Sequence, residues 1–159
     1  IPDMQGRIPQ DTLVELDRAF RHVLRGQSKR QYIFVARRNL PKDMTSYHAS
    51  AQPQALPKWL AYGRELKAQY LLIPQVLDWH QREGSGAGVT RSAHVRLEFF
   101  LLRVADGTLL KRSVFEEKQV GLTENLLTMG SFFKRKGAWV TAEVLAEEAM
   151  MQAVKELGL

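Results

Sequence analysis

Two histidines, His80 and His94, stand in segments of the sequence that are predicted to be neighbouring β-strands. If these strands pair antiparallel around the glycine-rich connection between them, His80 lies opposite His94 and Asp78 lies opposite Arg96. Facing imidazoles on paired strands could begin a metal site. The spacing therefore predicts a cross-strand histidine pair with an ion pair beside it.

A metal site needs more ligands than this pair supplies. Zinc takes at least three protein ligands, and the remaining histidines, His22 and His48, belong to other predicted elements. The chain has no cysteine, which excludes disulfides and thiolate ligands. We therefore expect no stoichiometric zinc and no cofactor, and we expect His80→Ala to leave the fold intact.

No residue pattern indicates catalysis. The sequence has no G-x-S-x-G elbow, and the acidic pairs Glu116-Glu117 and Glu147-Glu148 are typical of solvated positions. The segment "GSGAG" at residues 84–88 resembles a phosphate loop, but such a loop needs a helix directly after it. Here a strand is predicted on each side, so we expect a hairpin tip and no enzyme.

Positive charge gathers in the first third of a chain whose net charge is +6. The stretch 18–42 contains eight bases and no acid: Arg18, Arg21, Arg25, Lys29, Arg30, Arg37, Arg38 and Lys42. A basic face can bind nucleic acid, anionic lipid or an acidic partner. The interpretation that we favour is that it lies in solvent or beside the glutamate-rich C-terminal stretch. The candidate interaction residues here are Arg18, Arg21, Arg25, Arg37 and Arg38.

A second candidate surface is "GSFFKRKGAW" at residues 130–139. It places three aromatic residues around three bases, namely Phe132, Phe133, Trp139, Lys134, Arg135 and Lys136. Aromatic residues beside bases suit a membrane surface, a partner or single-stranded nucleic acid. The interpretation that we favour is that the same aromatic side chains close one edge of the core while the bases remain in water, in the connection from the hairpin to the C-terminal helix.

The elements that would position these residues follow from hydrophobic periodicity. Helices are predicted over 11–26, 58–68 and 141–158, the first with a capping box at Thr12 and Glu15 and a stop at Gly26. Pro57 is expected in the first turn of the second helix. The last helix places small residues on one face, typical of close packing on a sheet.

Strands are predicted over 31–36 and 69–80, and a long hairpin over 90–119 turns at Asp106-Gly107. Within the hairpin Ala93, Val95, Leu97, Phe99 and Leu101 share one face. Pro74 favours an edge strand or a bulge. The expected fold is a single α/β (α+β) domain over residues 1–159, with a mixed sheet of about four to five strands packed by about three helices.

Four segments resemble bacterial envelope lipoproteins that contain a domain of the TolB N-terminal, LpoB and CsgG type. They are "GRELKAQYLLIPQVLDW", "ADGTLLKRSVFEEKQ", "LTENLL" and "GAWVTAEVLAEEAM", within residues 58–157. In that group a helix precedes a strand that reads like "LGADYVLVG", and a hairpin with a "D(G/A)TG" turn follows. The usual opening strand of the "VAVLPF" kind is not visible in residues 1–10, and we expect it upstream.

The resemblance implies a periplasmic, outer-membrane-anchored domain, tethered through an upstream lipidated cysteine, that binds an envelope protein partner and is not an enzyme. It carries over scaffold positions and no catalytic or ligand residue. A homo-oligomer is compatible with it. The alternative is a cytoplasmic nucleic-acid-binding module that uses the stretch 18–42, and it is the less favoured of the two.

Overall fold

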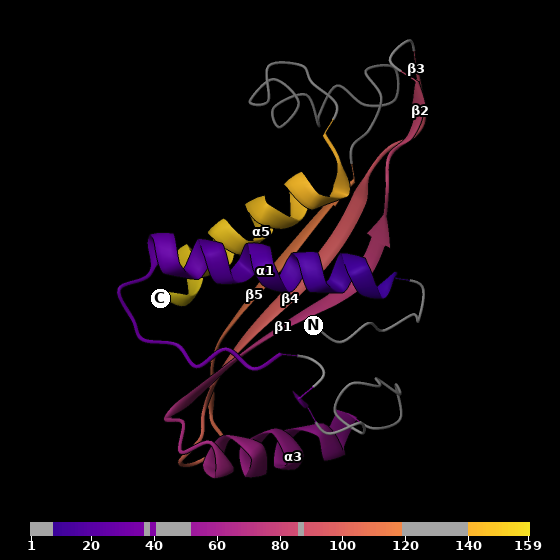
Figure 1. The fold of residues 1–159 in the computed structure, drawn as a ribbon. Coiled ribbons are helices and arrows are strands. Elements are labelled where there is room, and N and C mark those ends of the chain that lie inside the picture. Colours follow the sequence, from indigo (N-terminus) through magenta and orange to yellow (C-terminus); the bar gives the residue numbers. More distant parts are fainter. Residues whose placement is uncertain (1–7, 37–38, 41–51, 86–87, 119–139) are drawn as a thin grey trace.

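The computed structural model describes residues 8–36, 39–40, 52–85, 88–118 and 140–159. Its elements are α1 (Gln10–Gln27), α3 (Gln52–Glu65), β1 (Tyr70–His80), β2 (Glu83–Ser85), β3 (Gly88–Arg91), β4 (His94–Arg103), β5 (Leu109–Lys118) and α5 (Ala142–Leu157). Strands β1, β4 and β5 form an antiparallel sheet in the order β1-β4-β5, and β2 and β3 form a separate antiparallel ribbon. Helices α1 and α5 cross one face of the sheet, α3 packs at one end of β1, and the ribbon projects from the other end (Figure 1).

The predicted α/β class, the long antiparallel hairpin and the three helices are confirmed. The main sheet has three strands in the described part of the chain, fewer than the predicted four to five, and all its pairings are antiparallel. The difference arises at residues 31–36, where the predicted strand is wrong. This segment packs its aromatic side chains near α1, with Tyr32 bonded to Ser28 and Phe34 beneath two arginines.

Helix α1 follows the predicted apolar spacing and buries Leu13, Leu16, Phe20 and Leu24. It begins at Gln10 and runs to Gln27, so Thr12 lies inside it and Gly26 does not end it. The predicted capping box is therefore wrong, because Pro9 occupies the N-cap and makes no side-chain cap hydrogen bond. Glu15 instead pairs with Arg18 one turn later.

Helix α3 also starts earlier than predicted. It begins at Gln52, which places Pro57 inside the helix and not in its first turn. A proline at that position removes one helical hydrogen bond. The helix meets the sheet closely at Gly63, where a Cβ atom would lie 2.9 Å from Val104 and 3.0 Å from Leu71.

The core lies between β4 and the two helices on that face of the sheet, α1 and α5. The side chains of Ala93, Val95, Leu97, Phe99 and Leu101 are buried on the face that the sequence predicts. Small buried residues of α5 at Ala142, Ala146, Ala149 and Ala153 let that helix lie close to β4 and β5. The Phe99 ring contacts the Phe20 ring of α1 at a centroid distance of 5.3 Å, so both helices share one core.

Side chains from distant segments complete both ends of α5. At its start, the N-cap Thr141 makes no side-chain capping bond, and the Gln81 Oε1 atom accepts a hydrogen bond from the Ala142 N–H. At its end, Arg30 donates to the Gly158 carbonyl. A cation at a helix C-terminus is favoured by the helix dipole. Arg30 thus links the N-terminal basic stretch to the C-terminal end of α5.

The β4–β5 hairpin turns at the predicted place, but the connection is longer than two residues. It spans residues 104–108, and only its Gly107 has a positive φ, of 74°. The Asp106 carboxylate accepts hydrogen bonds from the Thr108 N–H at 3.0 Å and the Arg103 Nε atom at 3.1 Å. These bonds, that of Thr108 first, lower the pKa of Asp106 from 3.8 to about 2.

Gly107→Val is expected to destabilise the domain. A non-glycine residue in the left-handed region costs about 1–2 kcal/mol. In addition, a Cβ atom here would lie 2.8 Å from the Leu60 Cδ1 atom. We therefore expect the free energy of unfolding, measured with urea, to fall by about 1–2 kcal/mol or more.

The matched control for this change is Gly26→Ala in α1. A Cβ atom at Gly26 would have no neighbour within 4 Å, and its φ is not positive. Alanine replaces glycine favourably within a helix, so a gain of up to about 1 kcal/mol is expected. An unchanged unfolding free energy for Gly107→Val would show that the turn needs no left-handed residue.

Candidate functional site

A β-bulge in β1 decides which side chains share the sheet face that points away from α1 and α5. The register shifts between Val76 and Asp78, after which Asp78 pairs with Arg96 and His80 with His94. Without the extra residue, Asp78 would fall on the buried face with Val76, because side chains alternate along a strand. The register that the sequence predicts for both pairs is confirmed.

The Asp78 carboxylate lies between the two imidazoles. Its Oδ1 atom is 3.1 Å from the His80 Nε2 atom, and its Oδ2 atom is 3.2 Å from the His94 Nδ1 atom. The rings are nearly parallel, at an interplanar angle of 12° and a centroid distance of 6.0 Å. The Trp79 N–H donates to Oδ1 at 2.9 Å and helps to hold the carboxylate in place.

This arrangement differs from the predicted ion pair. Asp78 contacts both histidines, whereas the ion pairs of Arg96 are with Glu98 at 3.5 Å and Glu116 at 3.7 Å. The register places Asp78 opposite Arg96, but the Asp78 side chain contacts the two histidines and the Arg96 side chain contacts the two glutamates. The prediction of an Asp78–Arg96 ion pair is therefore wrong.

The three side chains of this Asp78–His80–His94 cluster offer ligand atoms that lie within 4.8 Å of one another. Their side chains are 27%, 38% and 19% exposed respectively, so solvent reaches the cluster while the sheet shields one side. A carboxylate and two imidazoles are ligands that divalent transition metals accept. The sequence prediction considered only histidines as the third ligand and so missed Asp78, although the predicted register already placed it on the same face, two residues from His80.

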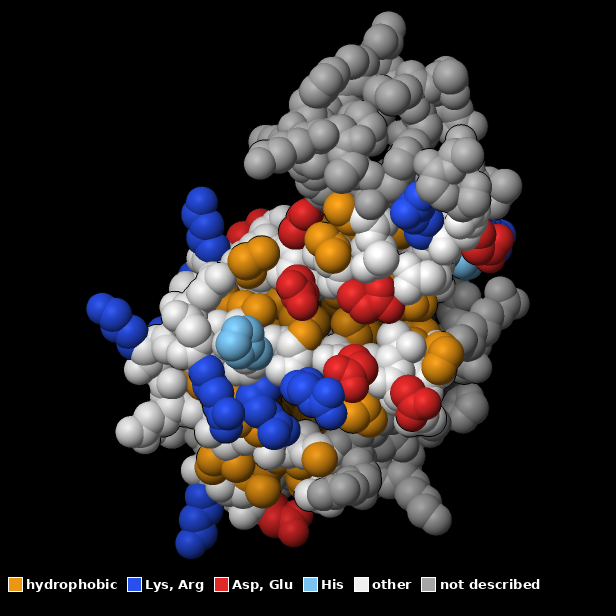
Figure 2. All heavy atoms as spheres, turned by 45° about the horizontal axis from the view of Figure 1, so that its top comes forward, with side chains coloured by type: hydrophobic (Ala, Val, Ile, Leu, Met, Phe, Trp, Pro, Cys, Tyr) orange, Lys and Arg blue, Asp and Glu red, His pale blue; other side chains and the backbone are white. Residues whose placement is uncertain are grey.

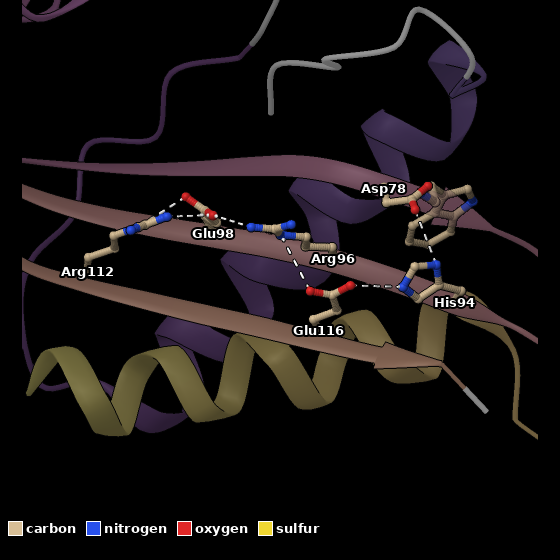
Figure 3. Close-up of polar contacts among 7 residues, drawn as sticks. Asp78, His94, Arg96, Glu98, Arg112 and Glu116 are labelled. Atoms are coloured by element: carbon tan, nitrogen blue, oxygen red, sulfur yellow. Dashed lines mark hydrogen bonds and ion pairs between the residues drawn. The ribbon is translucent and has the colours of Figure 1, made fainter. Parts of the chain in front are cut away.

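The cluster continues into a row of charged side chains across β4 and β5 (Figure 3). The Glu116 Oε1 atom lies 3.5 Å from the His94 Nε2 atom, and its Oε2 atom faces Arg96. The Glu98 side chain is only 6% exposed and accepts two bonds from Arg112, at 2.7 and 3.1 Å. Bidentate pairing of this kind satisfies a buried carboxylate.

A second candidate region is the basic face of α1. Arg18 pairs with Glu15 on its own helix at 2.7 Å. The Cζ atoms of Arg21 and Arg25 lie 4.9 and 5.5 Å from the centroid of the Phe34 ring. These distances allow cation–π contact. The other predicted site residues, Arg37, Arg38, Phe132, Phe133, Lys134, Arg135 and Trp139, lie outside the described residues.

A groove runs beside these arginines, between α1, residues 30–36, the end of α3 and the start of β1. Apolar side chains at or near it are exposed, Ile33 by 74%, Val14 by 53% and Tyr70 by 47%. Figure 2 shows Lys and Arg side chains gathered beside hydrophobic ones on the face that carries α1. This surface combines the residue types that are enriched in protein interfaces.

Comparisons with known proteins assign no family. No protein-family model matches the sequence, and no curated protein matches it significantly. Among the helices of the described residues, none has the length and apolar character needed to cross a membrane.

Proposed function

We propose that this chain is a non-catalytic domain of the bacterial cell envelope, in the periplasm or at the outer membrane, that works by binding another envelope protein. The resemblance to TolB N-terminal, LpoB and CsgG-type domains supports the compartment. The tether would be an upstream lipidated cysteine. The observation that carries the binding role is the groove beside α1, where exposed apolar side chains adjoin arginines.

The groove has the composition of an interface centre. Arginine and aromatic residues are over-represented among the residues that dominate binding energy. Arg21 and Arg25 are already placed over Phe34, so little side-chain freedom would be lost on binding. Ile33 supplies exposed apolar area next to them. A partner segment with acidic and apolar side chains matches this surface.

Two polar contacts of the basic stretch argue against the nucleic-acid alternative. Binding to a phosphate backbone uses arginine and lysine side chains that are free to neutralise phosphates. Arg18 is engaged with Glu15, and Arg30 donates to the Gly158 carbonyl. The basic stretch therefore offers fewer available charges than its sequence indicates.

The test is crosslinking of the full-length protein in its own bacterium. A photoreactive amino acid at Ile33 is expected to form a discrete protein adduct that is lost in Arg21→Glu/Arg25→Glu. Arg91→Glu, on β3 far from the groove, is the control and should keep the adduct. Adducts of equal yield in all three proteins would contradict the proposal, as would a precursor that lacks an export signal.

Binding of the purified chain to DNA or RNA checks the alternative. At physiological salt we expect only non-specific affinity, with a Kd of about 10⁻⁴ M or weaker. Sub-micromolar, sequence-selective binding that the double arginine reversal abolishes would favour the cytoplasmic nucleic-acid module instead.

A further inference from the structure

We propose that Asp78, His80 and His94 form a binding site for one divalent transition metal ion, with Zn²⁺ as the best fit. This site lies on the face of the sheet opposite the α1 groove, and the inference does not depend on the proposed function. It reverses the expectation of no zinc, because the missing third ligand is present. The geometry, the ligand types and the outer contacts each support it.

The spacing of the ligand atoms suits a small ion. Two ligand atoms held by tetrahedral zinc at about 2.0–2.1 Å are separated by about 3.3–3.4 Å. The Asp78 oxygens lie 3.1 and 3.2 Å from the His80 Nε2 and His94 Nδ1 atoms. All three ligand atoms fall within 4.8 Å of one another. Modest side-chain rotation would therefore bring them onto one ion.

The ligand types narrow the choice of metal. Imidazole nitrogens favour zinc, copper, iron and nickel, whereas Mg²⁺ and Ca²⁺ prefer oxygen ligands. Two imidazoles and one carboxylate are a ligand set that zinc uses with its fourth position open. The partial exposure of His80 and Asp78 would leave that fourth position to water or to a ligand from outside the chain.

The outer contacts have the form that metal sites use to orient a histidine. A ligating imidazole commonly directs its second nitrogen to a carboxylate. His94 turns its Nδ1 atom toward Asp78, and its Nε2 atom lies 3.5 Å from Glu116. Glu116 is in turn faced by Arg96 at 3.7 Å (Figure 3). This row would hold the imidazole in position for the ion.

A bound ion would join the edge strand β1 to the central strand β4. Asp78 and His80 lie on β1 and His94 lies on β4, where the bulge brings them to one face. The ion would bind the folded chain more tightly than the unfolded one, since the unfolded chain does not hold the three ligands together. Metal binding is therefore expected to raise the melting temperature.

The experiment uses the full chain without a polyhistidine tag, dialysed against chelator and titrated with Zn²⁺ by calorimetry. We expect one ion per chain. At a hundredfold excess over Kd, the melting temperature should rise by about 5 °C or more. Co²⁺ should give the visible absorption bands of a low-coordinate nitrogen and oxygen site, and Zn²⁺ should displace them.

Variants of the three ligands distinguish zinc binding at this site from zinc binding elsewhere on the chain. His80→Ala, His94→Gln and Asp78→Asn should each lose the one-to-one binding, whereas Glu116→Gln should keep the stoichiometry and weaken affinity about 10–100-fold. His22→Ala, on α1, is the matched control and should bind as the unaltered chain does. Circular dichroism checks that each variant is folded, and the half-exposed His80 is the one least needed for packing.

Two results would overturn the proposal. One is the absence of saturable Zn²⁺ and Co²⁺ binding to the unaltered chain. The contacts of Asp78 with His80 and His94 would then be hydrogen bonds alone. The other is binding that survives in folded His80→Ala and Asp78→Asn, or that disappears in His22→Ala. Neither result would affect the crosslinking test of the α1 groove, because the two sites share no residue.

Discussion

Phe99→Ala is expected to lower the free energy of unfolding by about 3–5 kcal/mol, the range for removing a large aromatic side chain from a core. Phe99 is fully buried at the centre of β4 and contacts Phe20 of α1. The loss combines the transfer free energy of the ring with the cavity that it leaves. Urea unfolding followed by circular dichroism measures the change.

The control for this prediction is Val114→Ala on the edge strand β5. Val114 is 40% exposed, and substitutions at such surface positions usually change stability by less than about 0.5 kcal/mol. A loss for Phe99→Ala no larger than the loss for Val114→Ala would show that the layer between α1 and the sheet is not the core of the domain.

Arg112→Met is expected to destabilise the domain by about 1–3 kcal/mol, the penalty for leaving a buried polar group without its partner. Arg112 makes two bonds to the Glu98 carboxylate, whose side chain is 6% exposed. Arg96 would remain at 3.5 Å but makes a single, longer contact. Thermal and urea unfolding at neutral pH measure the loss.

The double variant Glu98→Leu/Arg112→Met is the informative companion. Replacing both members of a buried ion pair by apolar residues is often neutral or stabilising, because the cost of burying the charge also disappears. We expect it to recover most of the stability that Arg112→Met loses. If both variants were equally unstable, the ion pair itself and not the stranded carboxylate would be the source of the effect.

The sequence by itself determined the elements whose signals are local. The apolar spacing of α1 and α5, the period-two run through Phe99 and the positive φ at Gly107 all depend on neighbours within a few residues. Register across the first hairpin was also predictable, because counting outward from the glycine-rich tip places His80 opposite His94. These features follow from backbone geometry and side-chain alternation.

Tertiary contacts decided the features that local signals left open. Residues 31–36 have the composition of a strand, but they pair with no strand of the described part of the chain and pack beside α1. The start of α3 at Gln52 and the absence of a capping box in α1 likewise depart from the local pattern. Propensity is a weak preference, and packing that buries aromatic area outweighs it.

The candidate sites were likewise predicted in part from the sequence and decided in part by the tertiary structure. The sequence supplied the arginines of α1 and the histidine pair, but the fold placed Phe34 beneath Arg21 and Arg25. The fold also turned Asp78 toward both histidines through one extra residue in β1. A bulge changes the facing of every later side chain in its strand, and its position depends on the partner strand. The predicted register already placed Asp78 on the face of the histidines, two residues from His80, but opposite Arg96. Only the tertiary structure shows that the Asp78 carboxylate contacts both imidazoles and not Arg96.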